Sequence, residues 1–358
     1  MIETSNTSVR LPARIEEQRL IEIAMSLPGQ KIGAVSVGRG QAAEQLAIDR
    51  SDAEVVCWYL DGYQANLAKQ HVDPLPNLTI ACEADWPAGE CDLTIIPISK
   101  GGEAELTRDV LQSAYHHLVI GGYLVASVDN PQDRWLHEQL KNYEKSVKVR
   151  SFEDAIVYFI QKTTELKKIK DFTCELSFRD CEATIRLITR PGVFSHRQLD
   201  NGTRQILDAI DVFPEAKLVD IGCGSGAIAL GMAARDPSAK IVAFDSNARA
   251  VWCAKQGAVL NGFENVDVGL NCTGEYGMAN QFDMALANPP YFADFRIARL
   301  FIDAAKRSLR PGGRLVVVTK QPKWYEENMP ELFNDVEVFE SRRYHIASGT
   351  KAMHEEST

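Results

Sequence analysis

The stretch KLVDIGCGSGAIALGMA, residues 217–233, decides the fold of this chain. A short aliphatic run leads into a turn with three glycines, and apolar residues at helical spacing follow the turn. Glycines in such a turn allow positive φ angles and let the backbone approach a ligand closely. A strand, a glycine-rich turn and a helix in this order are typical of an α/β protein built on a parallel sheet.

The segments that follow extend the same alternation of strands and helices. The run AKIVAFD ends at Asp245, a helical pattern follows, and the run FDMALA leads into the loop NPPY, residues 288–291. Residues 31–128 repeat this order, with VSVGRG (35–40) as the glycine-rich turn and IPIS (96–99) as the later loop. Such alternation predicts βαβ units in a doubly wound, mostly parallel sheet, and two copies predict two tandem Rossmann-like domains. We place the domains at 1–165 and 166–358, with the joint in the charged segment 161–178.

The two copies differ in their polar residues. Ser36 stands where the second copy has Asp220, and Gly38 and Gly40 are all that remains of the three glycines. The loop IPIS has neither a side-chain amide nor an aromatic ring. We therefore interpret the first copy as a degenerate domain that serves as a scaffold or as a recognition module.

Composition excludes several classes of protein. The chain has 358 residues, which suits two domains, and its 45% apolar and 25% charged residues are those of a globular protein. It has no apolar run of about 18 residues and no apolar segment near its N-terminus, so we expect a cytoplasmic protein without a membrane span. Its eight cysteines form no C-x-x-C pair, which favours reduced thiols and no metal site. We also expect a monomer.

The charge is unevenly distributed along the chain. The net charge of −10 weighs against a nucleic acid partner for the chain as a whole. Residues 1–160 carry 14 basic and 23 acidic side chains, whereas residues 161–358 carry 25 basic and 26 acidic side chains. We therefore expect any polyanionic partner to bind the second half of the chain, residues 161–358.

The spacing of the glycine-rich turn restricts the ligand. It reads G-x-G-x-G, with Gly222, Gly224 and Gly226, and Ala227 stands where the dinucleotide-binding motif has its third glycine. Asp220, two residues before the first glycine, would repel a pyrophosphate but suits the cationic end of an amino acid.

A second carboxylate indicates a nucleoside. Asp245 ends the next strand, where a carboxylate can accept hydrogen bonds from ribose hydroxyls. The alternative for Asp245 is the N-cap of the helix that follows it. A nucleoside that carries an amino acid is S-adenosylmethionine, which we predict as the cofactor.

The loop NPPY has the properties of a clamp for a flat, amine-bearing group. It follows a strand and therefore lies at the carboxyl end of the sheet, where open α/β folds bind ligands. Asn288 and the carbonyl of Pro289 can each accept a hydrogen bond, and the two prolines stiffen the loop. Tyr291 offers a flat face, and stacking on such a face contributes about 1–3 kcal/mol per base. Two acceptors that hold an amine can direct its lone pair at a methyl donor; the alternative is an ordinary Pro-Pro turn.

With these residues the chain resembles the class I S-adenosylmethionine-dependent methyltransferases. The segment TRPGVFSHRQLDNGTRQIL, residues 189–207, narrows the resemblance to the bacterial ribosomal RNA guanine-N2 methyltransferases. That family carries a P-G-V-F-S…L-D-x-G segment and two methyltransferase-like domains, of which only the C-terminal one binds the cofactor. One departure is Tyr291 followed by FADF, where the family usually has Phe, His and a nearby glycine.

The resemblance covers nearly the whole chain and implies methyl transfer to the exocyclic N2 of a guanine in ribosomal RNA, either free or in a ribosomal subunit particle. Under it, the cofactor would be held by Asp220, Gly222, Gly224, Gly226, Asp245, Asn271, Cys272, Phe194 and Ser195. The guanine would be held by Asn288, Pro289, Pro290 and Tyr291.

Basic residues near both ends of the second copy are candidates for contacts to RNA phosphate. One group adjoins the PGVFS segment and consists of Arg190, His196 and Arg197. The other lies in SRRYHIASGTK, which we expect to form the last edge strand, and consists of Arg342, Arg343, His345 and Lys351. Charges on an edge strand also protect against aggregation, so this second group remains open.

Two other functions remain open at the level of the sequence. The loop NPPY would also suit N-methylation of adenine or of a protein glutamine side chain. A noncatalytic RNA-binding assembly protein could retain the same fold.

Overall fold

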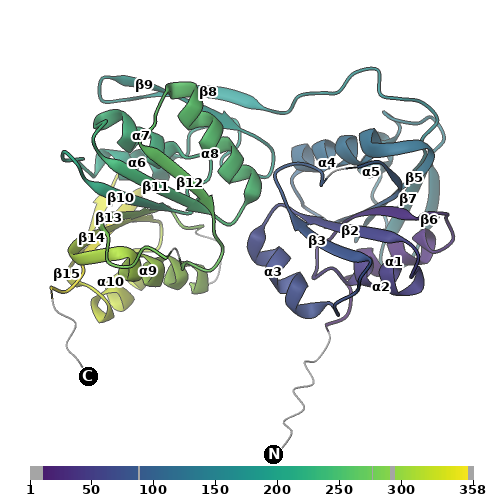
Figure 1. Cartoon of the computed structure of the whole chain (residues 1–358), viewed down its shortest axis with the longest axis horizontal. Coiled ribbons are helices and arrows are strands. Elements are labelled where there is room, and N and C mark those ends of the chain that lie inside the picture. Colours follow the sequence, from purple (N-terminus) through teal and green to yellow (C-terminus); the bar gives the residue numbers. More distant parts are fainter. Residues whose placement is uncertain (1–10, 88, 276, 291–294, 354–358) are drawn as a thin grey trace, which may run out of the picture. The chain divides into compact units, whose positions relative to one another are not determined.

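The computed structural model describes residues 11–353 except 88, 276 and 291–294 (Figure 1). The chain forms two compact units that divide between Phe172 and Thr173. This division falls within the segment 161–178, where the sequence places the joint. Each unit is described by itself below.

The first unit is a seven-stranded sheet with helices on both faces (Figure 1). Its strand order is β3-β2-β1-β4-β5-β7-β6, and only the pairings of β7 with β5 and β6 are antiparallel. The strands are β1 (Lys31–Val35), β2 (Glu54–Tyr59), β3 (Leu78–Cys82), β4 (Cys91–Ile98), β5 (Leu118–Val128), β6 (Lys148–Ser151) and β7 (Ile156–Gln161). The helices are α1 (Ile15–Ala24), α2 (Gln41–Asp49), α3 (Gly62–His71), α4 (Ala104–His117) and α5 (Trp135–Leu140).

The second unit repeats this topology, with the order β12-β11-β10-β13-β14-β16-β15. Its sheet consists of β10 (Lys217–Ile221), β11 (Lys240–Asp245), β12 (Val266–Leu270), β13 (Phe282–Ala287), β14 (Leu309–Thr319), β15 (Asn334–Ser341) and β16 (Tyr344–Thr350). Its helical elements are α6 (Asn201–Asp208), α7 (Ala227–Arg235), α8 (Ala248–Asn261), α9 (Arg296–Ser308), α10 (Pro322–Asn328) and the 3₁₀ turn η1 (Met329–Glu331). A separate hairpin, β8 (Cys174–Asp180) and β9 (Ala183–Thr189), precedes them. The predicted fold class, two tandem doubly wound α/β domains, is confirmed.

The second sheet is buried on both faces, which explains its continuous apolar strands. Successive side chains of a strand point to opposite faces. Leu218 accordingly packs in one core cluster with Ile241, whereas Val219 packs in another with Ala285 and Val317. A strand that needs apolar residues on both sides leaves few places for polar groups except at its ends, so the chemistry collects at the edges of the sheet.

The position of the C-terminal strand differs from the prediction. The segment SRRYHIASGTK was expected at the edge of the sheet, but β16 lies between β14 and β15, and β15 is the edge strand. The antiparallel hairpin that closes this fold inserts its second strand next to β14. Edge protection is therefore the wrong explanation for the charges of this segment.

In each unit a buried lysine directly follows the strand that pairs antiparallel with the parallel part of the sheet. The Nζ of Lys162 donates hydrogen bonds to the carbonyls of His116 and Leu118 at 3.1 and 2.7 Å. In the second unit, Lys351 Nζ donates to the carbonyls of Lys306 and Leu309 at 2.7 and 3.0 Å. Each ammonium thus satisfies carbonyls at the C-terminal end of a helix, where the helix dipole favours a cation. The prediction that Lys351 contacts RNA phosphate is wrong, because only 5% of this residue is exposed.

This lysine should matter for stability. Replacing Lys351 by alanine is expected to lower the free energy of unfolding by about 2–4 kcal/mol, since buried carbonyls would lose a charged donor. The side chain of Asn280 would lose its 2.6 Å contact with the same ammonium. Urea-induced unfolding measures the change, and Lys323→Ala, at an exposed position, is the control and should stay within about 0.5 kcal/mol of the wild type. Equal effects of the two substitutions would contradict this assignment.

Candidate active site at the carboxyl edge of the second sheet

The candidate site lies where the strand order of the second sheet reverses. Strands β10 and β13 are parallel neighbours, and Ile221 is paired in register with Ala287. The glycine-rich turn begins at Gly222 and the NPP segment at Asn288, so both leave the same edge at the same level. Open α/β sheets bind ligands at such a switch point.

Glycine is required at both ends of the turn because the φ angles there are positive and because a Cβ atom would collide with neighbouring side chains. Gly222 has a φ of 73° and Gly226 a φ of 83°, in the left-handed region. A Cβ at Gly222 would lie 2.5 Å from the ring of Phe301, and one at Gly226 would lie 2.9 Å from the Cβ of Ala254. The turn is therefore pressed between α9 and α8, and its remaining side faces the site.

The PGVFS segment lies over the middle of the turn. A Cβ at Gly224 would lie 3.9 Å from the Cβ of Phe194. The side chain of Phe194 is 55% exposed, and Ser195 has a φ of 59° and donates its Oγ hydrogen to the carbonyl of Gln198. The expectation that Phe194 and Ser195 close over a ligand bound at the turn remains a prediction.

Asp220 is a buried carboxylate with an unused acceptor. Its Oδ2 accepts a hydrogen bond from the backbone N–H of Ala229 at 3.1 Å. Within the part of the chain that the structure describes, its Oδ1 is buried and has no hydrogen-bond partner. Burial, with a smaller contribution from Asp245, raises the pKa of Asp220 to about 7. A ligand ammonium is the kind of group that would compensate this buried oxygen.

Asp245 does not cap the following helix. Its Oδ2 accepts from the backbone N–H of Gly224 and its Oδ1 from that of Asn247, both at 2.8 Å. The N-cap of α8 is Asn247, whose Oδ1 accepts from two backbone N–H groups of the first turn. The cap alternative for Asp245 is therefore wrong, although Asp61, its counterpart in the first unit, does cap α3. Half-buried Asp245 is thus held by the backbone of the glycine-rich turn and of the loop that leads into α8.

Asn271 and Cys272 lie next to Asp245. The backbone N–H of Asn271 donates to the carbonyl of Asp245 at 2.9 Å. The Asn271 side chain accepts from the N–H groups of Thr273 and Gly274 and donates to the carbonyl of Glu275. Its side chain thus shapes its own turn, and a contact to adenine from here would come from the backbone or from half-buried Cys272.

Asn288 is held by α6, which the sequence did not indicate. Its Nδ2 donates to Asp200 Oδ2 at 2.8 Å and to Thr203 Oγ1 at 3.3 Å. The NH₂ end of the amide therefore faces the start of α6, and Oδ1 lies on the other side of the amide. Pro289 is buried and Pro290 exposed. Tyr291 lies outside the described residues.

Part of the expected phosphate-binding group lies at this same edge. Arg342 and Arg343 are exposed in the turn between β15 and β16. Because His345 pairs with Thr319, at the end of β14, this turn lies at the carboxyl edge of the parallel strands. The Oγ of Ser341 donates to the side chain of Gln205 at 2.8 Å, which joins the turn to α6.

The basic residues beside the PGVFS segment are not equally available. The guanidinium of Arg190 lies 5.0 Å from the centre of the Trp252 ring, and His196 Nδ1 lies 2.9 Å from the buried hydroxyl of Thr189. Arg197 is exposed. Arg197 is therefore the most exposed of the three, whereas Arg190 and His196 also make contacts that hold the segment in place.

The equivalent turn of the first unit is filled by the protein's own side chains. The hydroxyl of Ser36 donates to Glu17 Oε1 at 2.6 Å and accepts from the N–H groups of Gly38 and Gly40. Glu17 belongs to α1 and is fully buried, and burial raises its pKa. A neighbouring carboxylate, Glu16, accepts from Ser99 Oγ at 3.1 Å in the loop that corresponds to NPPY. Carboxylates of α1 therefore occupy the mouth of the degenerate site.

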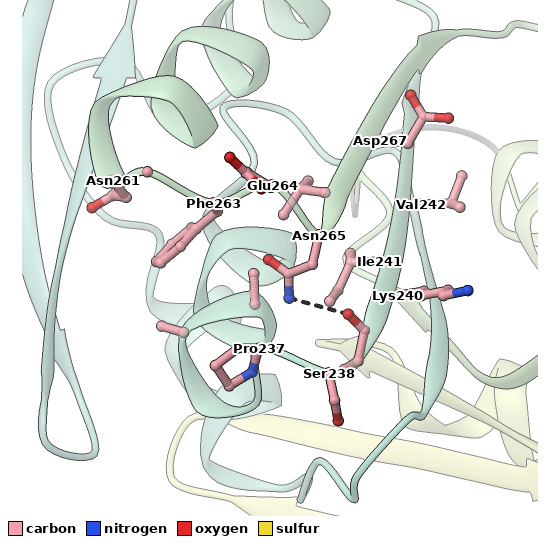
Figure 2. Close-up of a pocket in the computed structure, with 15 residues that line it drawn as sticks. Pro237, Ser238, Lys240, Ile241, Val242, Asn261, Phe263, Glu264, Asn265 and Asp267 are labelled. Carbon is pink, nitrogen blue, oxygen red and sulfur yellow. Dashed lines mark hydrogen bonds between the residues drawn. The ribbon is translucent and has the colours of Figure 1, made fainter.

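A hollow of about 790 Å³ lies at the opposite edge of the second sheet (Figure 2). Lys240 and Val266, at the amino ends of β11 and β12, line it. The Nδ2 of Asn265 donates to the carbonyls of Ala239 and Asp236, so this amide serves the backbone of its own loop. The hollow is remote from the glycine-rich turn, and we assign it no function.

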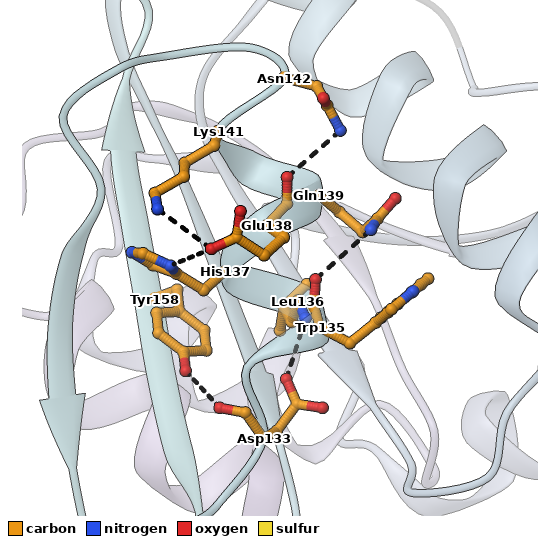
Figure 3. A network of polar contacts seen from close by, with 9 residues as sticks. All are labelled: Asp133, Trp135, Leu136, His137, Glu138, Gln139, Lys141, Asn142 and Tyr158. Carbon is orange, nitrogen blue, oxygen red and sulfur yellow. Dashed lines mark hydrogen bonds and ion pairs between the residues drawn. The ribbon is translucent and has the colours of Figure 1, made fainter.

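A polar network surrounds α5 in the first unit (Figure 3). Glu138 Oε1 lies 3.0 Å from Lys141 Nζ and 3.3 Å from His137 Nδ1. The hydroxyl of Tyr158 on β7 donates to the carbonyl of Asp133 at 2.6 Å. These contacts attach a short helix to the sheet and account for the cluster without a ligand. Across the described ranges, no group of three or more His, Cys, Asp or Glu side chains could hold a metal ion.

Comparison with known proteins gives consistent results for the second unit. The family model described as methyltransferase small domain matches residues 184–348. Proteins named ribosomal RNA small subunit methyltransferase C are similar to the chain. That of Cronobacter sakazakii is 33% identical over 154 residues (42% of this chain, 44% of the relative), and that of Shewanella pealeana is 27% identical over 315 residues (84% and 89%).

A solved structure resembles the whole chain. It is described as T. thermophilus 16S rRNA N2 G1207 methyltransferase (RsmC) in complex with AdoMet and guanosine. The TM-score is 0.77 with 19% identity, and the match covers 93% of this chain and 92% of that one, which shows a common fold.

The extent of the sequence matches varies. The chain spans about half the length of several curated relatives, for example 46% of the Pseudoalteromonas atlantica protein and 44% of the C. sakazakii protein. In the described ranges, each helix is too short or too polar to cross a membrane.

Proposed function

We propose that this protein methylates the exocyclic N2 of a guanine in ribosomal RNA. Residues 184–348 match the methyltransferase small domain model, and the chain is similar to proteins named ribosomal RNA small subunit methyltransferase C. S-Adenosylmethionine would be the methyl donor. The observation that carries this proposal is the placement of Asn288 and the glycine-rich turn at one switch point of the sheet.

The residues of the site suit this cofactor. The buried Oδ1 of Asp220, which has no partner among the described residues, would receive the α-ammonium group, and half-buried Asp245 would receive the ribose hydroxyls. The turn from Gly222 to Gly226 would pass beneath the methionine part, with Phe194 above it. When bound, S-adenosylmethionine supplies an electrophilic methyl group on a sulfonium.

The clamp would act by positioning. Asn288 Oδ1 and the carbonyl of Pro289 would accept the two hydrogens of the guanine amine, and Tyr291 would stack on the base. The amine lone pair is delocalised into the ring, so its direction matters more than a strong base. The product would lose its extra proton to water after transfer. The guanine would have to leave its stack to reach the loop.

The RNA would approach the carboxyl edge of the second unit. Arg342 and Arg343 are exposed there, and Arg197 is exposed in the neighbouring segment. The names of the relatives favour the small ribosomal subunit as the substrate. Such a substrate places the protein in the cytoplasm, and we propose that it acts there as a monomer.

The test is mass mapping of methylated nucleosides in ribosomal RNA from cells with and without the protein. We expect one guanine of the small-subunit RNA to lose N2-methylation, and purified protein should restore it on free RNA or on subunit particles. A change confined to methyladenine or methylglutamine would favour the alternative substrates. Unchanged RNA and protein methylation together with no S-adenosylmethionine binding would favour the assembly protein.

A further inference from the structure

Asp200 links the start of α6 to the candidate clamp. It is the N-cap of α6, and its Oδ2 accepts from the backbone N–H of Thr203 at 2.9 Å. The same oxygen accepts from Asn288 Nδ2 at 2.8 Å, across 88 residues of sequence. The cap alone would not need an aspartate, because serine and asparagine cap helices about equally well.

The contact selects one of two orientations of the Asn288 amide. The oxygen and nitrogen ends of a carboxamide have nearly the same shape, so packing hardly distinguishes them. An ionised carboxylate only accepts hydrogen bonds, whereas the hydroxyl of Thr203 can donate or accept. Asp200 therefore decides the orientation, because a turned amide would bring Oδ1 against a carboxylate oxygen.

We propose that Asp200 is a positioning residue that keeps Asn288 Oδ1 directed at the amine of the substrate. This inference rests on the proposed function. In the turned orientation, Asn288 would present its own NH₂ to the NH₂ of the base, and two donors would face each other. The charge-assisted bond from Nδ2 to Asp200 excludes that arrangement before the substrate arrives. The same NH₂ group also donates to Thr203 Oγ1 at 3.3 Å.

Two substitutions separate positioning from helix capping. In Asp200→Ser the shorter side chain can still cap α6 but cannot reach Asn288. In Asp200→Asn the amide oxygen can accept from both Thr203 and Asn288. We expect Asp200→Ser to lower kcat on ribosomal RNA by roughly 10- to 100-fold, and Asp200→Asn to stay within about threefold of the wild type. The affinity for S-adenosylmethionine and the melting temperature should stay near wild-type values in both variants.

A second readout does not depend on methyl transfer. The side-chain NH₂ of Asn288 can be followed by ¹⁵N NMR and identified by its absence in Asn288→Ala. We expect slowly exchanging hydrogens in the wild type and in Asp200→Asn, and faster exchange with shifted signals in Asp200→Ser.

The outcomes distinguish the two proposals. Wild-type kcat in Asp200→Ser, or an unchanged Asn288 signal, would overturn the positioning role of Asp200. So would a loss of kcat in Asp200→Ser that is matched by loss of cofactor binding or of folding. If the wild type methylates no ribosomal RNA, the proposed function fails, and the NMR comparison alone decides whether Asp200 orients the amide.

Discussion

Replacing Asn288 by alanine should reduce kcat for methyl transfer by about 10²- to 10³-fold, the effect of removing one preorganised hydrogen-bond partner from an active site. The carbonyl of Pro289 would remain as an acceptor, but a single acceptor leaves the amine free to rotate about one hydrogen bond. The cofactor should bind with an affinity within about threefold of the wild type, since the proposed cofactor contacts come from other loops. Single-turnover methylation of ribosomal RNA and calorimetric titration with S-adenosylmethionine measure the two effects.

Two further variants sharpen this experiment. Asn142→Ala removes an exposed asparagine of the first unit and should leave both measurements unchanged. Asn288→Asp keeps an acceptor but places a second carboxylate against Asp200, whose Oδ2 lies 2.8 Å from the present Nδ2. It should therefore be as inactive as the alanine variant at pH 8, because like charges at that distance force the side chain away. Near-normal turnover in Asn288→Ala would remove the clamp from the mechanism.

The strands of the second sheet could be predicted because their requirements are local. The runs KLVDI, KIVAFD and FDMALA coincide with β10, β11 and β13. Each is an apolar run closed by a turn or a polar residue, and a strand buried on both faces needs little more. The repeated order of strands also predicted the duplication, since each copy follows the same topology.

The wrong predictions concern residues whose partners are distant in sequence. Lys351 looked like one of several basic residues on an exposed strand, but it binds the carbonyl of Lys306, 45 residues earlier. Nothing in SRRYHIASGTK distinguishes it, because the pocket that buries it is formed by the end of α9. Its counterpart Lys162, at the same place in the first copy, is the signal that an alignment of the two halves could have used.

The same limit hid Asp200 and Glu17. Asp200 is the N-cap of α6, but the 88 residues between it and Asn288 carry no sign of their contact. The loss of Asp220 from the first copy was visible as Ser36, whereas the carboxylate that fills the space comes from a separate helix. In each unit a helix precedes the first strand of the sheet, and the two helices act differently. In the second unit α6 holds the Asn288 amide, whereas in the first unit α1 blocks the glycine-rich turn.

Replacing Asp220 by asparagine should have two opposite effects. The carboxylate is buried, and its pKa is raised from the ordinary value of 3.8 to about 7. The folded protein therefore binds this proton more tightly than the unfolded chain does. The stability that protonation contributes is complete below about pH 4 and is lost as the pH rises through 7. At pH 8 the cofactor-free variant should be about 1–2 kcal/mol more stable than the wild type, because a neutral amide costs less to bury than a carboxylate.

Cofactor binding should change in the other direction. An ammonium group that loses a buried anionic partner binds on the order of 10²- to 10³-fold more weakly. In the wild type, affinity should also fall as the pH drops below about 7, where Asp220 takes up its proton, and the asparagine variant should lose this dependence. Carboxylates of α1 occupy the glycine-rich turn of the first unit, so we expect no cofactor site there. Calorimetry should therefore find one cofactor site per wild-type chain and should find no additional site in Asp220→Asn. Asp267→Asn, at an exposed position on β12, is the control and should alter neither stability nor affinity. A variant that binds S-adenosylmethionine as the wild type does would show that Asp220 is a structural carboxylate that does not receive the ligand ammonium.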